Sequence, residues 1–222
     1  MDDDLRPQID QLRERVAGMA EHADAMLRGA LHALEHGDLA AADEVIDHDA
    51  GVDRAYAQVQ RGVFALIALH HPGGGDLRQL MGLVHVSLHV ERMADEAVGV
   101  AHTTKRAAED RGDEDAVQQL LELGGLAREV SLRARTAFLE DDAAAANGVT
   151  ELDRDVARLT EHIFQRLVRL PADDRASIAW AGRMIGLCRR LERFAGHGVD
   201  VAEQAVFVST GDHVQLRVPT TD

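Results

Sequence analysis

Aromatic residues, cysteine and proline are scarce in this chain of 222 residues. Phenylalanine, tryptophan and tyrosine together make up 3% of it, and it contains 4 prolines and 1 cysteine. β-Strands are enriched in aromatic and β-branched residues, so a core built mainly from leucine, valine, isoleucine, alanine and methionine favours packed helices over sheets. The single Cys188 excludes a disulfide within the chain, and we interpret it as a helix residue in a reducing compartment.

Long hydrophobic runs and an excess of positive charge are also missing. No apolar run approaches the roughly 18 residues of a membrane span, and the segment Met1-Asp2-Asp3-Asp4 has neither the basic region nor the apolar core of a signal peptide. The net charge is -15, from 24 basic and 39 acidic residues. Such a surface repels both phosphate backbones and anionic lipids. We therefore expect a cytoplasmic protein that binds no nucleic acid and meets a membrane only indirectly.

One segment of the chain recurs about a hundred residues later, which indicates an internal repeat. Val90-Glu91-Arg92-Met93-Ala94-Asp95 corresponds to Leu191-Glu192-Arg193-Phe194-Ala195-Gly196, and the flanking residues align in the same register. We predict a first copy over residues 1–111, a second copy over 112–209 and a loosely held polar tail over 210–222. The copies differ at an informative position, because Asp95 in the first corresponds to Gly196 in the second.

Apolar residues recur three or four positions apart along almost the whole chain, as on one face of an α-helix. Glycine, proline and aspartate interrupt this pattern at 36–38, 70–75, 111–113 and 171–174. The predicted helices cover about 9–36, 41–70, 76–101, 114–139 and 143–170, with a last helix that ends near 208. Asp76 is the predicted N-cap of the third helix, and Asp173 or Asp174 that of the last. The sequence therefore predicts an all-α fold of six helices in two tandem three-helix bundles.

Two pairs of acidic residues stand four positions apart on the predicted helices of the first copy. They are Asp49 with Asp53, and Glu91 with Asp95. Residues at this spacing lie on one helix face, with Cβ atoms roughly 5–6 Å apart, so both pairs can face one patch if their helices are antiparallel neighbours. Carboxylate oxygens suit hard cations such as Mg²⁺, Ca²⁺, Mn²⁺ or iron. On spacing alone, however, a solvated acidic face is the commoner explanation in a chain with 39 acidic residues.

Three segments, in the right order and at the right spacing, resemble one known family. Residues 69–78 resemble a family segment in which Gln-Pro and a small residue precede Asp-Leu-Arg, and Glu91-Arg92-Met93-Ala94-Asp95 resembles Glu-Arg-Ile-Gly-Asp. Residues 39–49 are similar to the opening of the family's second helix, where a Val-Ile pair precedes an aspartate. The family is PhoU, the bacterial phosphate-signalling regulators. The resemblance extends from about Ile9 to Gly211 and includes the two-copy layout.

This resemblance implies that the acidic pairs hold metal clusters on the bundle surface. Its first site corresponds to Asp49, Asp53, Glu91 and Asp95. In the second copy Asp153 and Glu192 match, whereas Ala157 and Gly196 replace the other two acids. Asp155, His197 or Asp200 could substitute for them, but each is displaced around its helix. We therefore expect one complete site and one lost or weaker site, for iron, manganese, magnesium or zinc.

Two histidines offer a different kind of ligand on the third predicted helix. His85 and His89 are four residues apart and precede Glu91, so with neighbouring carboxylates they could bind a transition metal. Histidines on helix faces are more often ordinary core or surface residues, and that is the interpretation we favour for this pair.

The function implied by the resemblance is regulation without catalytic turnover. A PhoU-like protein would repress phosphate uptake and the phosphate-starvation response when phosphate is plentiful. It would couple the nucleotide-binding subunit of a phosphate ABC transporter to a sensor histidine kinase, as a homodimer.

Two alternatives remain open. A di-iron or di-manganese enzyme on a helical bundle typically uses Glu-x-x-His on two helices, and no glutamate here has a histidine three residues later. Nucleotide-binding Gly-x-x-x-x-Gly-Lys and nucleophile-elbow Gly-x-Ser-x-Gly motifs are also missing. A metal-free structural or dimerisation bundle is the other alternative, and it predicts that the four acids can become amides without any effect on signalling.

Overall fold

The computed structural model describes residues 4–110, 112–170 and 175–217, and within these ranges it contains helices and no strand. The helices are α1 (Leu5–His36), α2 (Leu39–His70), α3 (Gly74–Ala107), α4 (Glu114–Leu139), α5 (Ala143–Asn147), α6 (Val149–Val168) and α7 (Arg175–Thr210). The predicted all-α class is confirmed. The predicted turn at Pro171 and the capping candidates Asp173 and Asp174 lie outside the described residues.

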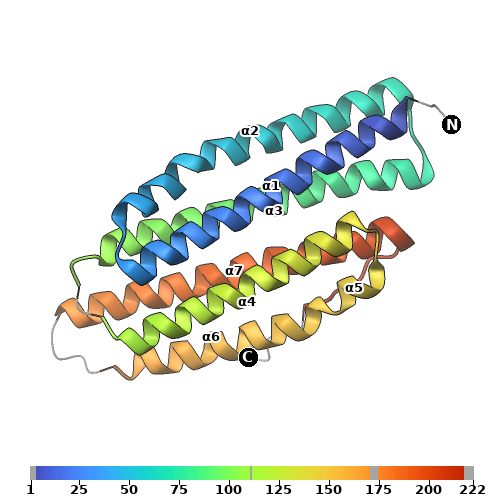
Figure 1. The fold of residues 1–222 in the computed structure, drawn as a ribbon. Coiled ribbons are helices and arrows are strands. Elements are labelled where there is room, and N and C mark those ends of the chain that lie inside the picture. Colours follow the sequence, from blue (N-terminus) through green and yellow to red (C-terminus); the bar gives the residue numbers. More distant parts are fainter. Residues whose placement is uncertain (1–3, 111, 171–174, 218–222) are drawn as a thin grey trace.

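The helices form two bundles that lie side by side (Figure 1). In the first, α1, α2 and α3 all pack against one another; in the second, α7 packs against α4, α5 and α6. The bundles meet through α3 against α7 and α1 against α4, so equivalent helices of the two copies face each other. As a result α2 and α6 lie on the two outer sides of the molecule (Figure 1).

The connection between α1 and α2 shows how the local sequence ends one helix and starts the next. Gly37 adopts a left-handed conformation with φ 65°, which glycine reaches without the steric penalty of a Cβ atom. The carboxylate of Asp38 then accepts hydrogen bonds from the backbone N–H groups of Ala40 and Ala41 at the start of α2. The break predicted at residues 36–38 is confirmed.

Two details of the predicted helices are wrong. The third helix begins at Gly74 with Gly73 at its N-cap, so Asp76 lies within the first turn, where its charge interacts favourably with the helix dipole. The helix predicted over 143–170 is divided at Gly148, whose N–H donates to the carbonyl of Ala145 three residues earlier, as in a tightened 3₁₀ turn.

The tail of the chain is also held more firmly than expected, as far as residue 217. Leu216 is buried against the core, and its backbone N–H donates to Glu203 Oε1 of α7 at 2.8 Å. The ring of His213 stacks on that of Phe207, with centroids 4.2 Å apart. An apolar anchor and a hydrogen bond therefore fold residues 211–217 back onto α7, and the expectation of a loose tail is wrong for this part.

Small residues allow the helices to approach closely in a core that runs through both bundles. Most of its buried residues are alanine, leucine and valine, and its buried aromatic side chains are those of Phe138, Trp180 and Phe194. Between α4 and α7, a Cβ atom on Gly198 would lie 3.2 Å from the backbone of Ser131. No helix in the described ranges combines the length and apolar character that crossing a membrane would require.

Candidate metal sites

The four acids of the predicted first site lie on the packed pair of helices α2 and α3. Asp49 and Asp53 belong to α2, and Glu91 and Asp95 belong to α3. Burial raises the pKa of Asp49, and the negative charges of Asp53 and Asp95 raise it further. Burial likewise raises the pKa of Glu91, with added repulsion from Asp95, Asp53 and Asp49. The acids of the two helices therefore act on one another electrostatically.

The carboxylate of Glu91 is largely buried. Its side chain is 16% exposed, and its Oε2 atom is buried and accepts no hydrogen bond. Arg92 lies at the edge of the group, with Nε 3.4 Å from that oxygen and Nη1 3.2 Å from Asp95 Oδ2. A carboxylate oxygen that is buried without a hydrogen bond fits a cation at this site, because a cation would offset the desolvation of the charge.

The four acids do not form a closed ligand cluster. Among the residues that the structure describes, three ligand atoms approach within 4.8 Å of one another only in the group of His89, His197 and Asp200. An ion on Asp49, Asp53, Glu91 and Asp95 would therefore require their carboxylates to come closer together. The assignment of these four ligands remains a prediction.

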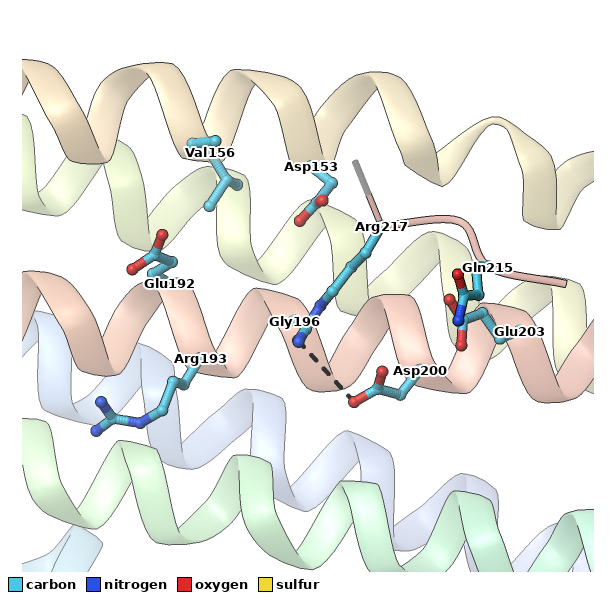
Figure 2. A pocket seen from close by; sticks show the side chains of 10 residues that line it. Asp153, Val156, Glu192, Arg193, Gly196, Asp200, Glu203, Gln215 and Arg217 are labelled. Carbon is cyan, nitrogen blue, oxygen red and sulfur yellow. Dashed lines mark ion pairs between the residues drawn. The ribbon is translucent and has the colours of Figure 1, made fainter. Parts of the chain in front are cut away.

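The second copy carries its two remaining acids beside a cavity of about 570 Å³. Asp153 projects from α6 and Glu192 from α7, and Ala157 and Gly196 line the cavity where the other two acids are missing. Arg217 reaches into this space from the tail, as Figure 2 shows. The second site thus contains a positive charge supplied by the chain itself.

Arg217 changes the electrostatics of this site. Its Nη2 atom lies 4.0 Å from Asp200 Oδ2 (Figure 2). Burial raises the pKa of Asp153; the charge of Arg217 opposes that effect, while Glu192 and Asp200 add to it. A metal ion on Asp153 and Glu192 would have to compete with this guanidinium. The weaker second site therefore also remains a prediction, now with an identified competitor.

The two histidines singled out on α3 have separate surroundings. His85 is exposed, and its Nδ1 lies 3.2 Å from Gln204 Oε1 on α7. His89 instead meets His197 and Asp200 of α7. Burial lowers the pKa of His89, although the charge of Asp200 opposes this. His85 and His89 therefore do not share a set of neighbours, and His89 belongs to a group that spans the two bundles.

Cys188 has the surroundings of a structural residue. Its side chain is buried, burial raises the pKa of the thiol to about 11, and Sγ donates a hydrogen bond to the carbonyl of Thr160. Because the thiolate is the nucleophilic form, this thiol is inert near neutral pH.

Together, the fold and these sites define a helical protein made of two copies of one helical unit, with acidic residues on α2 and α3 in the first copy and on α6 and α7 in the second. The family model described as "PhoU domain" matches residues 16–104 and again residues 120–205. The chain belongs to the PhoU family.

Named relatives and solved structures agree with this assignment. The chain is 31% identical over 206 residues to "Phosphate-specific transport system accessory protein PhoU homolog 1" of Mycobacterium leprae, covering 92% of this chain and 91% of the relative. It is 25% identical over 209 residues to the PhoU homolog of Clostridium acetobutylicum, covering 94% and 95%. The fold matches the phosphate transport system regulatory protein PhoU from Streptococcus pneumoniae with a TM-score of 0.88 at 23% identity, over 96% of this chain and all (100%) of that one.

Proposed function

We propose that this protein is a negative regulator of phosphate uptake and of the phosphate-starvation response. In this role it couples a phosphate ABC transporter, through the nucleotide-binding subunit, to the cytoplasmic domain of a sensor histidine kinase. It acts as a homodimer in the cytoplasm, reaches the membrane only through these partners, and catalyses no reaction. A carboxylate metal site on Asp49, Asp53, Glu91 and Asp95 belongs to this proposal.

The observation that carries the proposal is the match of both copies to the family domain along most of the chain. Two relatives that the match covers over 95% and 91% of their length are named accessory proteins of the phosphate-specific transport system. Those names describe accessory and regulatory proteins, which supports a function without turnover. The Oε2 atom of Glu91, which is buried and accepts no hydrogen bond although Arg92 Nε lies 3.4 Å away, supports the metal part of the proposal.

The regulatory role can be tested in cells from which the gene has been deleted. We expect the deletion to leave a phosphate-starvation reporter active in phosphate-rich medium and the intact gene to restore repression. In extracts of the same cells, tagged protein should retain the transporter's nucleotide-binding subunit and the kinase. Normal repression in the deletion strain, or recovery of neither partner, would contradict the proposal.

The metal site needs its own variant within the same experiment. A Glu91→Gln/Asp95→Asn protein should bind less manganese or iron and repress the reporter incompletely. The matched control is Asp10→Asn/Glu14→Gln, which removes two exposed acids at the same spacing from α1. Full repression by the first variant would remove the metal site from the function and favour the metal-free bundle, while leaving the regulatory role intact.

A further inference from the structure

Two histidines and one aspartate converge where the two copies meet. His89 of α3 has Nδ1 3.4 Å from Nδ1 of His197 and 3.3 Å from Oδ2 of Asp200, both on α7. The third side of the triangle, from His197 Nδ1 to Asp200 Oδ2, is 3.5 Å. Each side chain is about a quarter exposed, at 24%, 23% and 25% respectively, so an ion can reach them from solvent.

This nearly equilateral triangle has the dimensions of one face of a metal coordination sphere. Zinc lies roughly 2.0–2.2 Å from imidazole nitrogen and carboxylate oxygen, and a tetrahedral arrangement then separates the ligand atoms by about 3.3–3.6 Å. The three measured separations fall within that interval. Two imidazoles with one carboxylate also match the three-ligand sets of zinc and of non-haem iron sites, which leave further positions open.

Hydrogen bonds pair all three atoms only when both imidazoles carry their proton on Nδ1 and both donate to Asp200 Oδ2. If both histidines are neutral with the proton on Nε2, three lone pairs face one another without a donor. If one Nδ1 carries a proton, it donates to one neighbour, and the remaining atom still faces lone pairs. A cation at the centre of the triangle is attracted to all three atoms simultaneously.

The residues that the repeat makes equivalent to His89, His197 and Asp200 provide an internal comparison. The repeat relates Glu91 to Glu192, an offset of 101 residues, and the same offset relates His89 to Arg190 and Glu96 to His197. Glu96 accepts from Arg190 Nη1 at 3.0 Å and from Arg193 Nε at 2.7 Å. These equivalent residues are therefore paired by an ion pair between α3 and α7.

In the group of His89, His197 and Asp200, the two histidines occupy the positions equivalent to Arg190 and Glu96. Asp200 occupies the position equivalent to Gly99. In the equivalent group, Arg190 supplies a positive charge between the helices. The group of His89, His197 and Asp200 offers only ligand atoms at its centre. Arg217 approaches Asp200 Oδ2 no closer than 4.0 Å and is half exposed, so it can move aside.

We propose that His89, His197 and Asp200 form a binding site for a zinc-like transition metal ion that joins the two repeats. This site is separate from the four carboxylates of the predicted first site on α2 and α3. His89 and Glu91 are two residues apart on α3, which turns them about 200° away from each other around the helix. Imidazole ligands also select zinc, cobalt or iron rather than magnesium or calcium.

The test is titration of the metal-free, full-length protein with zinc chloride by calorimetry, and with cobalt chloride by absorption spectroscopy. We expect one zinc per chain at this site, and intense visible bands from cobalt in a nitrogen-containing, low-coordinate site. His89→Gln, His197→Gln and Asp200→Asn should each weaken zinc binding by roughly tenfold or more, since even residues that only support metal ligands are worth about 10–100-fold. Circular dichroism would verify that each variant is folded.

Two control variants distinguish this site from others. His102→Gln removes an exposed imidazole from the same helix and should leave zinc affinity unchanged. Glu91→Gln/Asp95→Asn should also leave the cobalt spectrum unchanged. Absence of zinc binding, equal binding by all variants, or loss of binding only in the carboxylate variant would each overturn the proposal. The measurement requires neither a partner protein nor phosphate, so its result is independent of the regulatory role.

Discussion

Arg217 and Gly196 are in direct contact, and the guanidinium occupies the space that a side chain at position 196 would fill. The repeat places Asp95 of the first copy at the equivalent position. Loss of an acid in the second copy has thus made room for a cation from the chain's own tail. Arg92 of α3 lies beside the acids of the first copy, whereas Arg217 of the tail acts on Asp153 in the second.

Restoring the acid should therefore release the tail. A Cβ atom on residue 196 would overlap Arg217, so we expect Gly196→Asp to displace the guanidinium and loosen residues 211–217. The cost to global stability should be small, below about 1 kcal/mol, because the arginine is half exposed. The measurement is the rate of tryptic cleavage after Arg217, followed by mass spectrometry. Gly182→Asp, at an open position of α7, is the control, and equal cleavage rates in the two variants would disprove the contact's role.

Neutralising Glu91 should stabilise the metal-free protein. Burial is the main reason that the pKa of this carboxyl is raised, and repulsion from Asp95 adds to it, so the charged form is disfavoured in the fold. With a chelator present, we expect Glu91→Gln to increase the free energy of unfolding by a few tenths to about 1 kcal/mol. Urea unfolding provides the comparison.

Added manganese should reverse this order. A ligand that binds only the folded state stabilises it by an amount that grows with the logarithm of its concentration over Kd. The wild-type melting temperature should therefore rise with manganese, while that of Glu91→Gln/Asp95→Asn stays constant. If Asp10→Asn/Glu14→Gln loses the same response, the effect is one of overall charge and the site assignment fails.

Local signals account for what could be predicted from the sequence. The apolar spacing predicted the helical class, and Gly37 with Asp38 marked a helix boundary because both act on adjacent backbone. The division at Gly148 was missed because apolar residues three positions apart continue across it, at Ala146, Val149 and Leu152. The group around His89 was missed for another reason, since His197 is 108 residues away in sequence and only the packing of α3 on α7 brings them together.

The start of α4 should lose stability in acid. Asp113 caps this helix by accepting from the N–H of Ala116, and it also pairs with Arg166 of α6 at 2.9 Å. Burial would raise the pKa of Asp113, but these two hydrogen bonds outweigh it, and the pKa is lowered. The stabilisation is therefore complete above the unfolded value of about 3.9 and is lost as the pH falls through the lower folded value.

Two substitutions distinguish the contribution of the capping hydrogen bond at α4 from that of the negative charge on Asp113. Asp113→Ala should cost about 1–2 kcal/mol at neutral pH by removing the cap. Asp113→Asn keeps a capping side chain and should cost less. The difference between wild type and Asp113→Asn, measured by urea unfolding, should shrink from about pH 7 to about pH 3; a difference that is constant with pH would show that the charge on Asp113 contributes nothing.

Two glycines of α7 should respond to alanine in opposite directions. At Gly198 a Cβ atom would lie 2.9 Å from Val130 Cγ1 and 3.2 Å from the backbone of Ser131, which cannot rotate away as a side chain can. We expect Gly198→Ala to cost about 1–3 kcal/mol through overpacking between α4 and α7. At Gly186 nothing lies within 4 Å, so alanine should gain up to about 1 kcal/mol from its higher helix propensity. Thermal unfolding of the two variants measures both effects in one helix, and a stabilising Gly198→Ala would mean that α4 and α7 are farther apart than described.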